Sequence, residues 1–249
     1  MNTAVEMPAA PATTPDPKKR VFVQQLFTTI APRYDRFNRL ASLGLDQRWR
    51  VRAIQDSGLR PGMDVLDVCT GTGDLALMCA ERLHGDGLVA GVDFNATMLR
   101  AAPAKQARAR QAVSWLRGDA QALPFQSGRF DRVFIGFSTR NLSDLRLGIA
   151  EMARMLRPGG QLVVLETGRP ANPIVRAGHR LFLMTAARAI GWALTGHVWP
   201  FTYLAKSTRQ FLPPSEFAEL LAGCGLVPQY RPLSWGLASL FVAMKPVAG

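Results

Sequence analysis

VLDVCTGTGDLA, residues 65–76, predicts a buried strand that runs into a glycine loop and then into a helix. Gly71, Gly73 and Ala76 satisfy the G-x-G-x-x-G/A spacing of nucleotide-binding loops, in which small residues permit a tight turn and close approach of the backbone to a ligand. Glycine also adopts positive φ without steric cost, so two glycines can serve a purely geometric turn. The loop alone therefore leaves open a nucleotide site and a structural turn.

Strands and helices alternate on either side of this loop. Strands are expected at 64–68, 88–94, 113–119, 130–138 and 161–167, and helices at 74–83, 96–110 and 144–156. The strands are apolar throughout rather than alternating, as expected when helices cover both faces of a parallel sheet. A helix at 214–226 and two further strands at 227–233 and 237–244 then predict a terminal hairpin. The expected fold is α/β, a doubly wound, mostly parallel seven-stranded sheet with one antiparallel edge strand and helices on both faces.

The segments before the first strand differ in character. Residues 1–20 are rich in Pro, Ala and Thr and lack an apolar core, which predicts a disordered tail rather than a signal peptide. Residues 21–60 show apolar spacing typical of two or three short helices, an N-terminal helical cap. The remaining length suits a single domain over 21–249. Three cysteines without ligand spacing give no indication of a metal site or a disulfide framework.

Positive charge is concentrated in two regions of a chain whose net charge is +12. Residues 18–52 hold nine Lys or Arg against two Asp, and residues 167–215 hold no acidic residue. Within the second region, residues 179–204 are apolar and aromatic but interrupted by Arg188 and His197, which argues against a transmembrane helix. A membrane-surface element and a core helix with solvated arginines both remain open. We expect residues 167–212 to form a basic, apolar lid.

Ligands of a doubly wound sheet bind at the carboxyl ends of the strands, so the residues that follow each strand are candidates. These are residues 70–74, Asp93, Asp119 with Ala120, residues 136–141 and Glu166. Asp93 lies 20 residues beyond Gly73, where a carboxylate accepts the hydroxyls of a ribose. The alternative is that Asp93 caps a helix that begins near Ala96.

At this point the chain resembles the class I S-adenosylmethionine-dependent methyltransferases, which have a Rossmann-like sheet. The resemblance lies in Asp67, GTGD at 71–74, Asp93, GDAQALPF at 118–125 and MLRPGG at 155–160. In that fold Asp119 faces the adenine, whose amine it can accept from, while the Ala120 N–H can donate to a ring nitrogen. Cys69 occupies the position of the first fingerprint glycine, which matters little because no pyrophosphate has to be bound.

Four longer stretches resemble the ubiquinone/menaquinone biosynthesis C-methyltransferase family. They are LFTTIAPRYDRFNRLASLGLDQRWR at 26–50, FSTRN at 137–141, LETGRP at 165–170 and YLAKSTRQF at 203–211, within a match over about 23–244. The resemblance implies that the cofactor, S-adenosylmethionine, is bound by Gly71, Thr72, Gly73, Asp93, Asp119 and Ala120. It implies methyl transfer to a ring carbon of a polyprenylated hydroquinone, in menaquinone (demethylmenaquinol) or ubiquinone biosynthesis. The chain departs from the family pattern at Gly136, Ser138, Thr139 and 196–201.

Transfer to a neutral arene carbon needs activation, because ionising the ring hydroxyl pushes charge onto that carbon. Arg140 and Asn141, directly after the fourth predicted strand, are the candidates for binding the acceptor and stabilising the phenolate, with Tyr34 as a further candidate for the same pocket. No metal is needed. The alternative is that Arg140 caps a neighbouring helix or pairs with Asp144.

A substrate with a bilayer-embedded tail predicts a cytoplasmic protein held peripherally at the inner face of an anionic membrane. A methyltransferase of another small aromatic acceptor is an alternative. An RNA or DNA methyltransferase would explain the charge, but FSTRNL is neither a polar-Pro-Pro-aromatic motif nor a cysteine site, so no nucleic-acid partner is expected. A non-catalytic nucleotide-binding or oxidoreductase module leaves Asp119 and Arg140 without a role. The sequence leaves a homodimer open.

Overall fold

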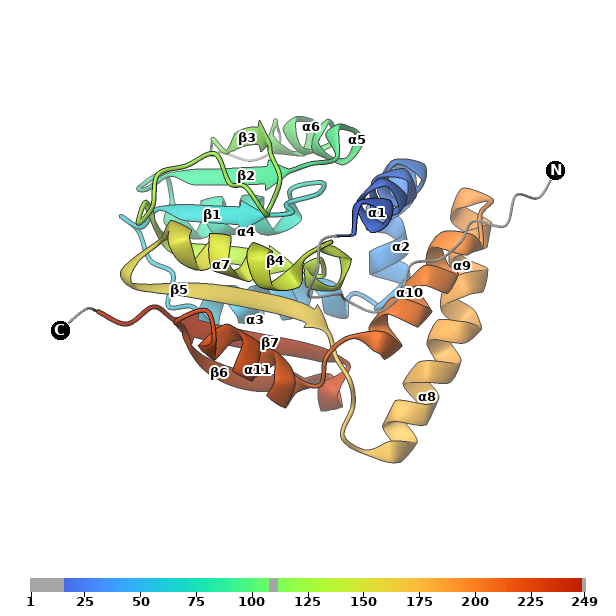
Figure 1. Ribbon diagram of the computed structural model, residues 1–249. Coiled ribbons are helices and arrows are strands. Elements are labelled where there is room, and N and C mark those ends of the chain that lie inside the picture. Colours follow the sequence, from blue (N-terminus) through green and yellow to red (C-terminus); the bar gives the residue numbers. More distant parts are fainter. Residues whose placement is uncertain (1–15, 108–111, 248–249) are drawn as a thin grey trace.

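The fold is a seven-stranded sheet in the order β3-β2-β1-β4-β5-β7-β6 in the computed structural model, which describes residues 16–107 and 112–247 (Figure 1). The strands are β1 Val65–Val68, β2 Val89–Asp93, β3 Ser114–Arg117, β4 Phe130–Gly136, β5 Leu156–Thr167, β6 Val227–Leu233 and β7 Ala238–Met244. Strands β1 to β5 pair in parallel, and β7 runs antiparallel to both β5 and β6. The doubly wound fold and the terminal hairpin are confirmed. The antiparallel strand lies one place inside the edge, because β6 pairs along its outer side.

Helices cover both faces of this sheet. Helices α3 Leu45–Asp56 and α4 Asp74–Leu83 pack on one face, and α7 Leu145–Met155 and α11 Pro214–Ala222 pack on the other. Strand residues alternate between the two cores: Val133 and Ile135 face α7, while Phe134 faces α4. The helix predicted at 96–110 is interrupted, as α5 Ala96–Leu99 and α6 Ala102–Gln106, with Pro103 in the first turn of α6 where its missing N–H costs little. Residues 108–111 of that prediction lie outside the described residues.

A helical layer stands beyond the carboxyl ends of the parallel strands (Figure 1). It combines α1 Pro17–Ile30, the short turn η1 Ala31–Arg33 and α2 Tyr34–Ala41 with α8 Pro173–Met184, α9 Ala186–Thr195 and α10 Trp199–Gln210. Its core joins both ends of the chain, since Phe22 of α1 packs on Tyr203 of α10, and Phe37 of α2 packs on Phe201 with ring centroids 4.4 Å apart. Helices α1 and α2 of the predicted cap therefore pack with α8, α9 and α10 of the segment predicted as a lid at 167–212, whereas α3 of the predicted cap packs on the sheet. Within residues 16–107 and 112–247, no helix is long and apolar enough to cross a membrane.

The disordered tail predicted at 1–20 is wrong for residues 17–20, which form the first turn of α1. Asp16 caps this helix by accepting from the backbone N–H groups of Lys18 and Lys19, and Pro17 occupies its first position. Lys19 is buried, and its Nζ donates to the Leu142 carbonyl at 2.7 Å, which ties α1 to the end of β4. Burial lowers the pKa of Lys19 to about 8. The rest of the predicted tail, residues 1–15, lies outside the described residues.

Candidate functional site

The glycine loop between β1 and α4 is shaped by positive φ angles at three alternate residues. Cys69, Gly71 and Gly73 all have positive φ, at 55°, 58° and 85°. A Cβ on Gly73 would lie 2.6 Å from the ring of Trp115, so only glycine fits between the loop and β3. The fold itself thus requires Gly73, and the turn brings the Gly71 N–H to the carboxyl ends of the strands.

A first cavity, the strand-end cavity, opens beside this loop. Its lining includes the polar residues Asp93, Asp119 and Ser138 and the small residues Gly71, Gly118 and Ala120. The Asp93 carboxylate accepts from the N–H groups of Gly71 and Asn95, both at 2.8 Å. Burial raises its pKa to about 6. The alternative that Asp93 caps the next helix is wrong, because Asn95 caps α5.

Asp119 and Ala120 reach the same cavity from the end of β3. Asp119 accepts from the N–H of Gln121 at 3.0 Å and pairs with Arg20 of α1 at 3.1 Å. Arg20 also lines the cavity, although sequence reasoning assigned it to the tail. The signal that was missed is the Asp-Pro pair at 16–17, a typical helix start.

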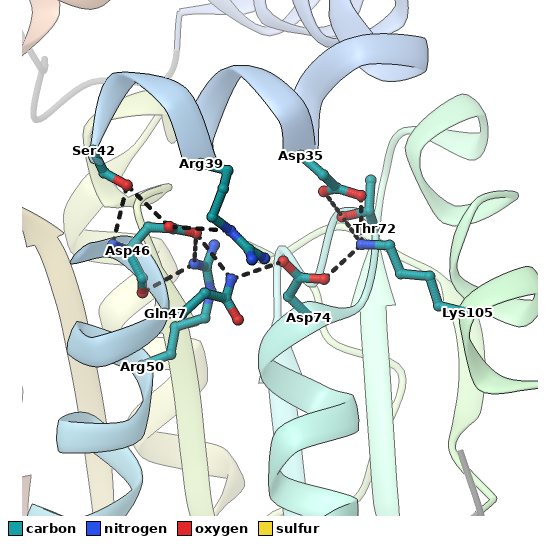
Figure 2. Close-up of polar contacts among 9 residues, drawn as sticks. All are labelled: Asp35, Arg39, Ser42, Asp46, Gln47, Arg50, Thr72, Asp74 and Lys105. Atoms are coloured by element: carbon teal, nitrogen blue, oxygen red, sulfur yellow. Dashed lines mark hydrogen bonds and ion pairs between the residues drawn. The ribbon is translucent and has the colours of Figure 1, made fainter. Parts of the chain in front are cut away.

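Thr72 is not among the residues that line the strand-end cavity, and its side chain lies in a polar network that joins the helical layer to the glycine loop (Figure 2). Its hydroxyl donates to Asp35 at 2.7 Å and accepts from Lys105 at 2.9 Å. Lys105 Nζ also lies 2.6 Å from carboxylate oxygens of both Asp35 and Asp74. The same view shows the corner between α2 and α3, formed by Arg39, Ser42, Asp46, Gln47 and Arg50. Thr72 lines a small recess with Asp67, next to the strand-end cavity.

A second, apolar cavity of about 580 Å³ lies between the helical layer and the sheet. Its walls come mainly from α2, α8 and α10 and include Phe37, Phe182, Leu183, Phe201 and Leu204. Tyr34 and Asn141 line both this cavity and the strand-end cavity, and Arg140 lines the apolar one. The structure therefore brings all three predicted acceptor residues to the junction between a polar and an apolar space.

Arg140 is held by the buried carboxylate of Glu166 at the end of β5. Its Nη1 forms an ion pair with Glu166 and donates to the Phe137 carbonyl at 2.8 Å, and its backbone N–H donates to Glu166 at 3.2 Å. Thr139, one of the departures from the family pattern, donates its hydroxyl to the same carboxylate at 2.6 Å. The alternative pairing of Arg140 with Asp144 is wrong, because Asp144 caps α7 by accepting from Leu147.

Three buried polar atoms at this junction have no hydrogen-bond partner among the described residues: Arg140 Nε, Asn141 Nδ2 and Asn141 Oδ1. Buried polar groups are nearly always hydrogen-bonded, and exceptions mark places where a ligand or water completes the bonding. Burial also raises the pKa of the Tyr34 hydroxyl, which keeps it protonated and able to donate. The junction thus offers two unpartnered donors, Arg140 Nε and Asn141 Nδ2, and one unpartnered acceptor, Asn141 Oδ1.

The departure at 196–201 shapes the apolar cavity. Pro200 and Phe201 are buried and line the cavity, and Phe201 packs so closely that a Cβ on Gly191 would lie 2.1 Å from its ring. An aromatic residue here replaces acidic, hydrophilic sequence of the family pattern, and it fills the space between α2 and α9. The departure thus lies in the wall of the apolar cavity, and none of residues 196–201 lines the strand-end cavity.

The family pattern and the relatives that match this chain point to the same family. The pattern of the ubiE/COQ5 methyltransferase family matches residues 14–245. The demethylmenaquinone methyltransferase of Deinococcus radiodurans is 39% identical over 223 residues, which cover 90% of this chain and 92% of that protein. Those of Thermus thermophilus and Desulfitobacterium hafniense are 38% and 36% identical, over 89% and 92% of this chain and 100% and 91% of theirs.

Solved structures share the fold at much lower identity. A SAM-dependent methyltransferase from Aquifex aeolicus superposes with a TM-score of 0.59 at 18% identity, over 79% of this chain and 89% of that one. A SAM-dependent methyltransferase from Thermotoga maritima superposes with a TM-score of 0.63 at 16% identity, over 89% of this chain and 99% of that one. These likenesses establish the class I methyltransferase architecture.

Proposed function

This chain belongs to the ubiE/COQ5 methyltransferase family, and on that basis we propose that it methylates a ring carbon of a demethylmenaquinol with S-adenosylmethionine as methyl donor. The observation that carries the proposal is the set of unpartnered polar atoms on Arg140 and Asn141, at the inner end of an apolar cavity. A hydroquinone with a prenyl tail has the matching form, since its ring oxygens need donors and its tail needs an apolar space. The names of the relatives favour the naphthoquinol over the benzoquinol acceptor.

The strand-end cavity suits the cofactor. Two carboxylates, Asp93 and Asp119, follow adjacent strands and line one cavity, as the ribose hydroxyls and the adenine amine require. Gly71, Gly73 and Ala120 would let the backbone approach the nucleoside. Thr72 would act through the position of the loop, because its hydroxyl is engaged with Asp35 and Lys105. When bound, S-adenosylmethionine supplies an electrophilic methyl group.

The acceptor chemistry follows from the junction. Loss of the ring hydroxyl proton to water would place negative charge on the ring, and the unpartnered donors Arg140 Nε and Asn141 Nδ2 would stabilise that charge. After methyl transfer, the methylated ring carbon would release its own proton to water. Tyr34, protonated and shared by both cavities, would position the ring between them. The residues of the chain thereby orient the ring and stabilise its charge, which supplies most of the catalysis in a direct transfer.

The basic groove on the outer side of α8 and α10 supports peripheral binding to an anionic membrane at its cytoplasmic face. The groove is lined by Arg169, Arg176, Arg180, Arg188 and Arg209, and none of the described residues that line it is acidic. Lipid headgroups carry the opposite charge, and polybasic surfaces are attracted to them. Such a position would place the helical layer where a membrane-embedded acceptor resides.

Purified protein with demethylmenaquinol and methyl-labelled S-adenosylmethionine tests this function directly. We expect a labelled product heavier by one CH₂ group, and no label in the matching benzoquinol or in RNA. Cells that lack the protein should accumulate the demethylated naphthoquinone. Labelling of another small aromatic compound in preference to the quinol would contradict the proposed substrate.

A further inference from the structure

Three large apolar side chains surround the outer opening of the apolar cavity. Leu40, Leu43 and Trp235 all line the cavity, yet 52%, 89% and 85% of their surfaces are exposed. Leu40 and Leu43 lie at the turn from α2 to α3, and Trp235 lies in the turn η3 Ser234–Gly236 between β6 and β7. We call these three residues the cavity rim. Large apolar side chains so exposed at the mouth of a cavity mark an interaction site.

The backbone at the cavity rim is strained. Leu43 and Trp235 have positive φ, 52° and 58°, which bulky residues rarely adopt, and Ser234 beside Trp235 does so as well. The Ser234 hydroxyl accepts from Trp49 Nε1 at 2.9 Å, which fixes η3 against α3. Strain of this kind persists where the surrounding structure enforces it and clusters at functional positions.

The surface around the rim is positive. Arg36, Arg39 and Arg48 of α2 and α3 are exposed. The acidic residues of the same segment are engaged within the protein, as Asp35 pairs with Lys105. The buried Asp46 pairs with Arg50 and also, at 3.7 Å, with Arg39. An apolar tip with a tryptophan, next to helices that carry exposed arginines, has the chemistry of a segment that enters the headgroup region of an anionic bilayer.

We infer that the cavity rim inserts into an anionic bilayer and forms the portal through which the prenyl tail of the acceptor enters the apolar cavity. The inference rests on the proposed function for the identity of the acceptor. Because the rim and the ring-binding junction belong to one cavity, a tail can pass from lipid to protein without exposure to water. The outer end of the cavity would hold the tail while the inner end, at Tyr34 and Asn141, holds the ring.

The test compares acceptors with long and short tails. We would replace the rim in the double variant Leu43→Asn, Trp235→Asn, since asparagine tolerates positive φ and the fold should persist. Leu147→Ser, at an exposed leucine on α7 away from the cavity, is the matched control. The readout is the ratio of kcat/KM for a long-tailed demethylmenaquinol in phosphatidylglycerol vesicles to that for a one-isoprene analogue in solution. We expect the ratio to fall at least tenfold in the double variant and to stay at the parental value in Leu147→Ser.

Insertion itself has an independent readout. Brominated phosphatidylglycerol should quench part of the tryptophan fluorescence of the parent, and Trp235→Phe should remove that part. An unchanged ratio together with absent quenching would overturn the portal. A dimer in solution that dissociates in the double variant would also overturn it, because a second copy of the chain would then cover the rim. Failure of the parent to methylate either acceptor would instead contradict the proposed function, while the quenching experiment still decides whether the rim enters lipid.

Discussion

Asn141 is a residue whose proposed role in the reaction comes with a cost to the stability of the fold. Its amide is buried, and neither of its polar atoms finds a partner among the described residues. A buried polar group without a hydrogen-bond partner destabilises the fold, so Asn141 lowers the free energy of unfolding. The neighbouring Arg140 differs, because its Nη1 is engaged with Glu166 and with the Phe137 carbonyl.

We therefore expect Asn141→Ala to lower kcat by about 10²-fold, the effect of losing one preorganised donor, while the free energy of unfolding stays the same or rises by about 1 kcal/mol. The measurement pairs turnover with urea denaturation. Arg140→Ala should instead reduce both kcat and the free energy of unfolding, because it leaves the buried Glu166 carboxylate without its cationic partner. A stability loss in Asn141→Ala would mean that its amide has a structural partner in solution.

Asp67 predicts an unusual pH dependence. Burial raises its pKa from 3.8 to about 7, so between pH 4 and pH 7 the folded protein keeps a proton that the unfolded chain has lost. Its contribution to the free energy of unfolding is therefore largest at low pH and declines as pH rises through this window. Asp67→Asn should remove a decline on the order of 3 kcal/mol between pH 4.5 and 7.5, measured by urea unfolding of both proteins. Parallel pH profiles for parent and variant would show that Asp67 does not titrate in this range.

At the scale of elements, the sequence predicted what local patterns encode. Strand and helix positions follow from apolar runs and their spacing, and Asp93 and Asp119 were found because each comes directly after a strand. The first turn of α1, residues 17–20, was missed although Asp16 and Pro17 are a local signal of a helix start. The burial of Lys19 in that turn could not be predicted, because it depends on a tertiary contact with Leu142. The Thr72 contact with Asp35 was missed for the same reason, since those residues are 37 positions apart.

The glycine loop gives a prediction on packing. Gly73→Ala should lower the free energy of unfolding by about 2–4 kcal/mol, because the new Cβ would meet Trp115 and the positive φ disfavours alanine. Gly196→Ala is the control, with φ +73° but nothing within 4 Å of its Cβ, and should cost only about 1 kcal/mol. Equal losses in the two variants, measured by chemical denaturation, would show that contact with Trp115 carries no penalty.

The network around Lys105 gives a second prediction for an element. Lys105→Met leaves Asp35 and Asp74 as unpaired like charges and should loosen α2 from the glycine loop by about 0.5–1 kcal/mol. Amides of α2 should then exchange hydrogen about two to five times faster. Arg52→Met removes an ion pair to Asp56 within α3 and serves as the control. Faster exchange of α2 in the control alone would exclude the network as its anchor.

At the scale of the whole molecule, charge is distributed unevenly, with the arginine groove on the helical layer. Binding to anionic vesicles should fall steeply between about 0.05 and 0.3 M salt, since attraction between exposed charges is screened over about 8–10 Å. Co-sedimentation of Arg180→Glu, Arg188→Glu should fall severalfold, while Arg82→Glu, on α4, should bind like the parent. Equal binding to neutral vesicles would favour the alternative of a core helix with solvated arginines.

The place of β7 in the sheet bears on how the protein is made. The penultimate and last strands of the chain complete the sheet, and β7 inserts between β5 and β6. Until the ribosome has released residues 238–244, the outer edge of β5 has no partner, and an open edge promotes association with other chains. The nascent protein thus carries an open strand edge from the synthesis of β5, which ends at Thr167, until β7 at Ala238–Met244 is added, and formation of the hairpin is a step at which chaperones would matter.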